Sequence, residues 1–301
     1  MKQIFMKYAF AIVLIFSALG SQGQDSIDTT SYWSHDGELG LNFSQLSLVN
    51  WNAGGVSSIA LNGLFRYNTK YEKGSHSWET GLEAGYGFIR RDGEDLIKSD
   101  DQLALFSQYN KQWKQKHLNY SALLKFNTQF TDGFNYPNDS VVISSFMAPA
   151  YIIYSVGITY KPSKNFSLLV SPITGKTTIV NDDTLAAQGA FGVDPGEKIR
   201  NEVGALLKGR WKTQVMENID FETKLTLFSN YLENPQNIDV NWQAFLSMKV
   251  NSLITVTLNT ELIYDDDIKI AIDNNDDGVI DARGPRIQFK ELLGIGFSYK
   301  F

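Results

Sequence analysis

Hydrophobic and polar residues alternate along most of this chain, with a period of two residues. In the segment "LNYSALLKFNTQF", Tyr120 and Leu124 share one face while Asn119 and Lys125 share the other. Such alternation indicates strands that lie between an apolar and a polar environment. Twelve segments show it: 37–48, 56–71, 77–90, 102–113, 118–130, 150–160, 166–176, 200–212, 219–229, 240–250, 254–264 and 287–301.

The length of these segments and of their connections indicates a membrane barrel. Soluble strands average about 5–6 residues, whereas a strand tilted across a bilayer needs about 9–11. Short connections such as "KQKH" alternate with long polar ones such as "RDGEDLIKSDD" (91–101). Outer-membrane barrels have such short periplasmic turns and longer outer loops. We therefore expect a closed antiparallel transmembrane β-barrel of about 12 strands, in the outer membrane of a Gram-negative bacterium; a large soluble β-sandwich is the alternative.

The last predicted strand ends on Phe301. A sheet in hydrocarbon must close on itself, so this strand should pair with the first one. Its outward side chains Phe297, Tyr299 and Phe301 would then lie at the inner membrane boundary, where aromatic rings are favoured. Four more aromatic residues fall at the same end of their strands, on the outward face: Trp78, Trp113, Tyr160 and Trp211.

The N-terminus has the features of a secretory signal peptide, with two lysines, an apolar run and then small residues. A buried N-terminal helix is the alternative. We expect residues 1–23 to be the signal peptide, 24–36 a short periplasmic lead and 37–301 the barrel. After the signal, no run of about 18 apolar residues suggests a membrane-spanning helix.

Three stretches resemble an uncharacterised outer-membrane β-barrel family of Bacteroidota: "FSQLSLVNWNAGG", "YDDDIKI" and "GPRIQFKELLGIGFSYKF". The resemblance covers most of the mature chain. It implies the fold and the location, but that family has no established activity to transfer. The terminal phenylalanine, preceded by aromatic or apolar residues at alternate positions, also resembles the sorting signal of bacterial barrels. That resemblance implies that the barrel-assembly machinery is a partner during insertion.

The opposite face of each strand should line the lumen, with acidic and basic residues nearly balanced. A polar interior inside an apolar exterior would be the inverse of a soluble barrel. The charged residues expected to line the lumen are Arg66, Glu79, Glu83, Lys125, Glu202, Lys208, Arg210, Glu222, Lys224, Lys249, Glu261 and Lys290.

Balanced charge gives no field of a single sign, which a selective ion pore usually has at its constriction. Twelve strands lie between the filled core of about eight strands and the water channel of about 16–18. We expect a narrow or loop-occluded lumen that passes small hydrophilic solutes, the alternative being a non-conducting structural or accessory subunit of an outer-membrane complex. Residues 178–198, which include Phe191, would form a plug or a mobile outer loop. The expected partners are outer-membrane lipid and, in the alternative, envelope proteins, with no nucleic acid.

Catalysis is not expected. A membrane-barrel lipase needs a serine nucleophile beside a histidine base on the lipid face. We expect His35 to precede the first strand and His76 and His117 to lie in short turns, away from the outer leaflet. No serine-hydrolase, metalloprotease or phosphate-loop motif occurs in a suitable context. Glu79 and Glu83 are better explained as members of an ion-pair network, so no cofactor is expected for catalysis.

One acidic stretch, "DNNDDGVID", suggests calcium. Carboxylates at alternate residues can converge on one ion when a glycine lets the chain turn. Position 12 of an EF-hand-type loop would be Gly284 instead of a bidentate glutamate, so binding should be weak unless Asp265, Asp266 or Asp267 completes the site. A solvated acidic turn is the alternative. The expected ligands are Asp273, Asn275, Asp277, the carbonyl of Val279, and Asp281.

Overall fold

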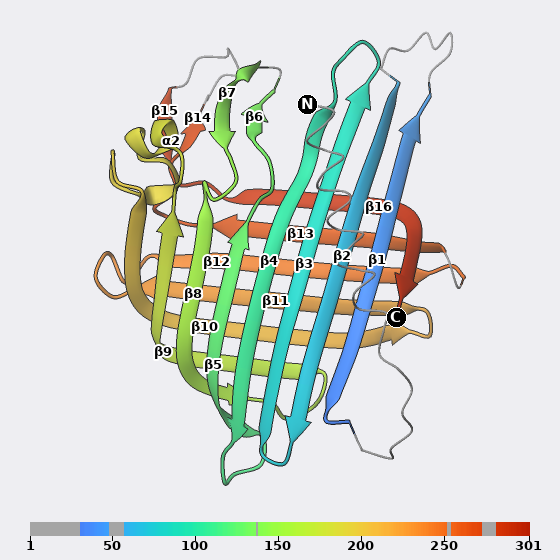
Figure 1. Ribbon diagram of the computed structural model, residues 1–301, viewed down its shortest axis with the longest axis vertical. Helices are drawn as coiled ribbons and strands as arrows, with labels where there is room; N and C mark the ends of the chain where they lie inside the picture. The colour runs from blue at the N-terminus through green and yellow to red at the C-terminus, as the bar shows by residue number, and fades with distance from the viewer. Residues whose placement is uncertain (1–30, 48–56, 137, 252–253, 273–280) are drawn as a thin grey trace. The chain divides into compact units, whose positions relative to one another are not determined.

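Twelve long strands pair edge to edge into a closed antiparallel barrel (Figure 1). The computed structural model describes residues 31–47, 57–136, 138–251, 254–272 and 281–301. The barrel strands are β1 (Trp33–Leu46), β2 (Ser58–Lys73), β3 (His76–Arg91), β4 (Ile97–Gln112), β5 (Leu118–Thr128), β8 (Ala150–Tyr160), β9 (Phe166–Ile179), β10 (Ile199–Met216), β11 (Ile219–Asn230), β12 (Ile238–Lys249), β13 (Ile254–Tyr264) and β16 (Gln288–Lys300). Because β1 also pairs with β16, the predicted closed β-barrel is confirmed.

The two ends of the barrel differ. We call the end with the short connections, where β1 begins and β16 finishes, the turn end, and the opposite end the loop end. The smaller elements all lie in connections at the loop end: the hairpin β6 (Gly133–Asn135) and β7 (Asn138–Ser144), the helices α2 (Asp183–Ala187) and η1 (Ala190–Gly192), and the hairpin β14 (Ile270–Ile272) and β15 (Ala282–Gly284). Within the described part of the chain, no helix has the length and apolar character to cross a bilayer.

The alternation of the sequence becomes an apolar exterior. Along β5 and β8 the outward side chains of Leu124 and Val156 are 52% and 62% exposed. Their inward neighbours Leu123 and Ser155 are both 4% exposed. Exposed large apolar side chains continue over most of the other strands, which is the reverse of a soluble barrel.

The interior is not wholly polar. An apolar cluster lines the wall formed by β5 and β8 to β11; its members are Leu123, Leu169, Leu206 and Phe228, with Ile153 against them. Charged and polar side chains occupy most of the remaining inward positions, as the alternation predicts, with Phe106 and Phe245 among the exceptions.

Aromatic rings gather on the outside at the turn end. Trp78, Trp113, Tyr160 and Trp211 are 39–47% exposed there. Trp113 stacks on Tyr120, with ring centroids 5.1 Å apart. The position of these rings matches the aromatic belt inferred from the sequence.

The barrel closes between β1 and β16. Residues Glu38–Phe43 pair with Ile295–Lys300, and Gly37 and Phe301 exchange two backbone hydrogen bonds of 2.8 and 3.0 Å. The Phe301 ring lies over Gly37, so closely that a Cβ at this glycine would overlap it. Stacked contacts to Tyr67 and Tyr299, with centroids 6.5 and 5.9 Å away, cover the ring further. The terminal phenylalanine is therefore part of the seam.

Two strand boundaries differ from the sequence prediction. β1 begins at Trp33 instead of 37, because residues 33–36 continue the pairing with β2. β4 begins at Ile97, so the connection expected at 91–101 is only 92–96. The polar residues of this stretch pair with β3. Their polar composition is typical of a loop, so the sequence did not indicate this pairing.

Two histidines are also placed differently. His35 lies within β1 and His76 begins β3, and both are on the outward face at the turn end. Each meets a tyrosine hydroxyl, of Tyr67 and Tyr109 respectively. They belong to the aromatic belt at the end opposite to the loop end. His117 lies in the turn between β4 and β5, as expected.

Replacing Gly296 by alanine should destabilise the seam, because the new Cβ would overlap the backbone carbonyl of Leu41 on β1, which the strand pairing holds in place. We expect a loss of about 1–3 kcal/mol in the free energy of unfolding, typical of overpacking. Urea unfolding in detergent micelles measures it. Gly40→Ala is the matched control, since a Cβ there lies 3.6 Å from Leu64 Cβ, an ordinary contact. Equal stability of the two variants would contradict this account of the seam.

Candidate functional site: the charged lumen

Lys176 is the centre of an ionic network at the loop end of the lumen. Its Nζ atom lies 2.7 Å from Asp239, 3.0 Å from Asp265 and 3.5 Å from Glu202. The Phe228 ring lies 5.4 Å from the same nitrogen. The lysine and Glu202 side chains are only 10% and 3% exposed. Three carboxylates therefore share one cation with little access to water, which makes the lysine hard to replace.

Arg200 extends this network to the loops. It donates hydrogen bonds to the Gly192 carbonyl at 2.9 Å and to Glu233 at 2.9 Å, and it lies 2.8 Å from Asp267. These partners come from three different connections: β9–β10, β11–β12 and β13–β14. Arg200 is also 3.8 Å from Glu202, so the two cations share a carboxylate. We call this set of residues around Lys176 and Arg200 the mouth network.

The mouth network is acidic overall. It holds two cations, Lys176 and Arg200, against five carboxylates: Glu202, Glu233, Asp239, Asp265 and Asp267. The excess of negative charge favours cations and disfavours anions at this end of the lumen.

The connection between β9 and β10 folds onto its own apolar cluster. Leu185 and Ala186 of α2 are buried with Ala148, Val180 and Val193, and Phe191 packs against them. Asp182 caps the helix by accepting hydrogen bonds from two backbone N–H groups. On the outside, Lys198 lies 2.6 Å from Asp183 and holds the pKa of that carboxyl below its usual value through the hydrogen bond. This segment, expected to be a plug or a mobile loop, thus packs at the mouth, where Arg200 binds it.

Side chains from separate walls meet farther inside the lumen. The Arg66 guanidinium carbon lies 4.7 Å from the Phe245 ring centroid, and Lys208 Nζ lies 5.6 Å from that of Phe106. In each pair the two strands are four places apart around the ring of twelve. Such cation–π contacts are attractive, and their interaction energy is larger when they are shielded from water. The lumen is therefore crossed by side chains at this level, which we call the constriction.

Ion pairs between neighbouring strands line the rest of the lumen. Arg66 lies 3.2 Å from Glu83 and 3.9 Å from Glu38. Toward the turn end, Arg210 donates two hydrogen bonds to Glu222, at 2.9 and 3.2 Å, and Lys224 lies 3.4 Å from the same carboxylate. Arg66 and Glu83 side chains are still 22% and 29% exposed, so space remains around them.

Most of the predicted lumen residues take part in such contacts. Lys290 lies 3.4 Å from Glu261 and 3.3 Å from Asp100 of β4. Lys125 is inward on β5, opposite Phe106 of β4. Glu79 is opposite Gln108 on the adjacent strand, and Lys249 ends β12 at the turn end.

Sequence reasoning missed Lys176, Arg200, Asp100, Asp239 and Asp265. Alternation assigned Lys176 to the wrong face because β9 carries an extra residue at Pro172. There the pairing of β9 with both β8 and β10 shifts by one residue. A bulge of this kind reverses the faces beyond it, so strict alternation from Phe166 places Lys176 outside. Proline within an apparent strand was the signal available.

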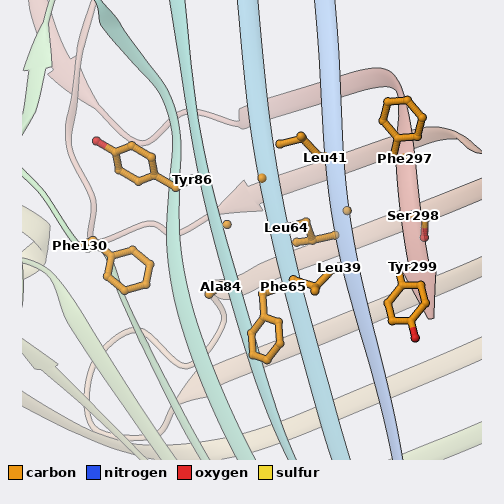
Figure 2. A pocket seen from close by; sticks show the side chains of 13 residues that line it. Leu39, Leu41, Leu64, Phe65, Ala84, Tyr86, Phe130, Phe297, Ser298 and Tyr299 are labelled. Carbon is orange, nitrogen blue, oxygen red and sulfur yellow. The ribbon is translucent and has the colours of Figure 1, made fainter. Parts of the chain in front are cut away.

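A shallow apolar groove of about 610 Å³ lies on the outer wall (Figure 2). It forms where Gly63 and Ala84 leave room between larger outward side chains. Leu39, Leu41, Phe65, Tyr86, Phe130, Phe297 and Tyr299 surround it. Its lining carries no charged side chain, so hydrocarbon is its natural filling.

Only one of the predicted calcium ligands, Asp281, lies in the described part of the chain. Asp273, Asn275, Asp277 and Val279 lie outside the described residues, and Asp281 is exposed just before β15. Asp265 and Asp267 are engaged with Lys176 and Arg200. Within the described ranges, no group of three or more His, Cys, Asp or Glu residues is arranged to hold a metal ion. Calcium binding stays a prediction.

One family model matches part of the chain. Residues 43–134 match the family described as "Protein of unknown function (DUF3078)". No curated protein matches the chain.

Among solved structures, the chain is similar to the COG4313 outer membrane channel from Pseudomonas putida F1, with 12% identity, a TM-score of 0.41, and coverage of 92% of this chain and 100% of that one. It is also similar to the NanC porin, with 10% identity, a TM-score of 0.38 and coverage of 88% and 99%. The translocator domain of the autotransporter NalP from Neisseria meningitidis has 6% identity, a TM-score of 0.37 and coverage of 98% and 95%. At this level of similarity, the fold rests on the chain's own strand pairing.

Replacing Lys176 by methionine should strongly destabilise the loop end, because three carboxylates then face one another without their cation. We expect a loss of about 3–5 kcal/mol in the free energy of unfolding, as for a broken buried ion pair. Lys198→Met is the matched control, since its pair with Asp183 is exposed and should contribute little. Urea unfolding of both variants checks this, and similar midpoints would contradict a central role for Lys176.

Proposed function

We propose that this chain is an integral outer-membrane β-barrel with a narrow, charged lumen that passes small hydrophilic solutes. The observation that carries the membrane assignment is the inverted distribution of side chains around a closed sheet. Only a closed sheet satisfies every backbone group in hydrocarbon, and this barrel presents apolar side chains to the outside on strand after strand. The turn end would then face the periplasm and the loop end the medium.

The lumen supports slow passage of small solutes. Its inward side chains are charged and partly exposed, as Arg66 and Glu83 show. The Arg66–Phe245 and Lys208–Phe106 contacts make it narrow. An acidic mouth network ahead of this constriction favours small cations and neutral polar solutes over anions.

A second candidate is a non-conducting structural or accessory subunit. The Arg66–Phe245 and Lys208–Phe106 contacts favour this role if together they close the lumen completely. In that case the barrel would act through its loops or its lipid-facing surface, and envelope proteins would be its partners. Single-channel recording separates the two: a small, stable current supports passage, and silence supports the accessory role.

An arginine on the apolar exterior tests the membrane assignment. Leu124→Arg places a charge midway along β5, where we expect a loss of about 2–4 kcal/mol in folding into phosphatidylcholine bilayers. Leu232→Arg is the control. Leu232 is 76% exposed in the connection after β11, so its replacement should cost only about 0–1 kcal/mol. If the exterior faces water instead, both variants will fold as well as the parent chain.

Removing one ring of the constriction tests the lumen. Phe245→Ala frees Arg66 from its partner across the lumen, so we expect a larger single-channel conductance in planar bilayers than in the parent chain. Phe126→Ala, on an outward position of β5, should leave the current unchanged. A parent chain that conducts nothing, together with a silent Phe245→Ala variant, would reject passage and leave the accessory role.

A further inference from the structure

The seam between β1 and β16 is paired over only part of its length. Pairing runs from the turn end as far as Phe43 and Ile295. Beyond this point β1 stays paired with β2, and β16 stays paired with β13 as far as Gln288. Figure 1 shows β16 bending away from β1 toward the loop end. Within the described residues, the two strands thus separate while each remains part of the wall.

In the part of the chain that the structure describes, the separation leaves some backbone groups of β16 without a partner on β1. Gly37 and Phe301 exchange both of their hydrogen bonds, and in an antiparallel ladder such pairs recur at every second residue. By this alternation, Leu293, Glu291 and Phe289 direct their N–H and C=O groups toward β1. Among the described residues no partner pairs with these groups. In a membrane such groups need polar atoms beside them.

The opening joins an apolar surface to a polar one. Outside it, Phe289 and Leu293 are 60% and 63% exposed. Inside it, Lys290 lies 3.3 Å from Asp100, which in turn accepts a hydrogen bond from Asn62 at 3.1 Å. A ligand in the opening would therefore contact hydrocarbon-like side chains on one side and charged or amide groups on the other.

We propose that this opening is a lateral portal, through which a membrane lipid places its polar head against the lumen while its alkyl tail stays outside. The inference rests on the proposed membrane location. A polar head can hydrogen-bond the unpaired backbone of β16, which an alkyl tail alone cannot. A partner β-strand fits less well, because the two edges diverge, so that a strand paired with one edge would leave the other unpaired.

Disulfide trapping tests the opening, since the chain has no cysteine of its own. Leu41 and Phe297 are paired across the closed part of the seam. Gln45 and Leu293 would be the equivalent pair if pairing continued in the same register. We expect the Leu41→Cys/Phe297→Cys variant to form an intramolecular disulfide on oxidation, and the Gln45→Cys/Leu293→Cys variant to remain reduced. Equal oxidation of both variants would overturn the proposal.

Fluorescence quenching tests the lipid. Single-cysteine variants carrying the same fluorophore are placed in phosphatidylcholine vesicles with brominated acyl chains. The matched positions are Leu292, inward at the opening; Leu64, inward where β2 is paired on both sides; and Leu293, outward. We expect strong quenching at Leu292→Cys and Leu293→Cys, and little at Leu64→Cys.

Each outcome has a separate meaning. Quenching at Leu292→Cys no greater than at Leu64→Cys overturns the portal, even when Leu293→Cys is quenched. An unquenched Leu293→Cys variant instead overturns the membrane location, and the portal falls with it. All three variants are compared only in the heat-modifiable folded fraction, so that a folding defect cannot imitate either result.

Discussion

Backbone hydrogen bonding is the constraint on which this structure depends. Where the surroundings of a sheet are apolar, every edge N–H and C=O group must find a partner within the protein. The barrel meets this condition by pairing its last strand with its first, through residues as far as the terminal Phe301. The glycine at position 37 leaves room beside this pairing for the Phe301 ring, which a Cβ there would overlap. The outer part of the seam, where pairing stops, is the place where the condition is not met by described residues.

Closure of the barrel also determines how its interior is filled. A closed ring of twelve strands encloses more space than side chains of one wall can fill. Long cationic side chains span it: Arg66 and Lys208 reach aromatic rings four strands away, and Lys176 reaches Asp239 and Asp265. These contacts brace the barrel and narrow the lumen at the same time. The same contacts therefore serve both stability and the narrowing of the lumen, and a variant that widens the constriction should also weaken the barrel.

Much of the fold could be predicted from the sequence, because an apolar exterior imposes a strict period of two. The segments predicted at 150–160 and 254–264 have the same bounds as β8 and β13. Polarity misplaced the start of β4, because its first residues carry polar side chains such as Lys98 and Asp101, which form an ion pair of 2.9 Å.

The site was less predictable, because it depends on contacts between distant segments. Glu202 and Lys290 could be assigned to the lumen from alternation alone. Their partners Lys176 and Asp100 could not, since one follows a bulge at Pro172 and the other lies in a stretch with the composition of a loop. The cross-lumen rings of Phe106 and Phe245 give no sequence signal, because an inward phenylalanine resembles any other apolar residue.

The mouth network and the portal lie at the same end of the barrel but differ in what they can hold. At the mouth, five carboxylates compete for Lys176 and Arg200, and three connections meet on the arginine. Opening this route requires those ion pairs to break together. At the seam, by contrast, no described strand pair has to separate for an amphiphile to enter. On the proposed function, an amphiphile would therefore enter from the side, whereas a small cation would be attracted to the acidic mouth.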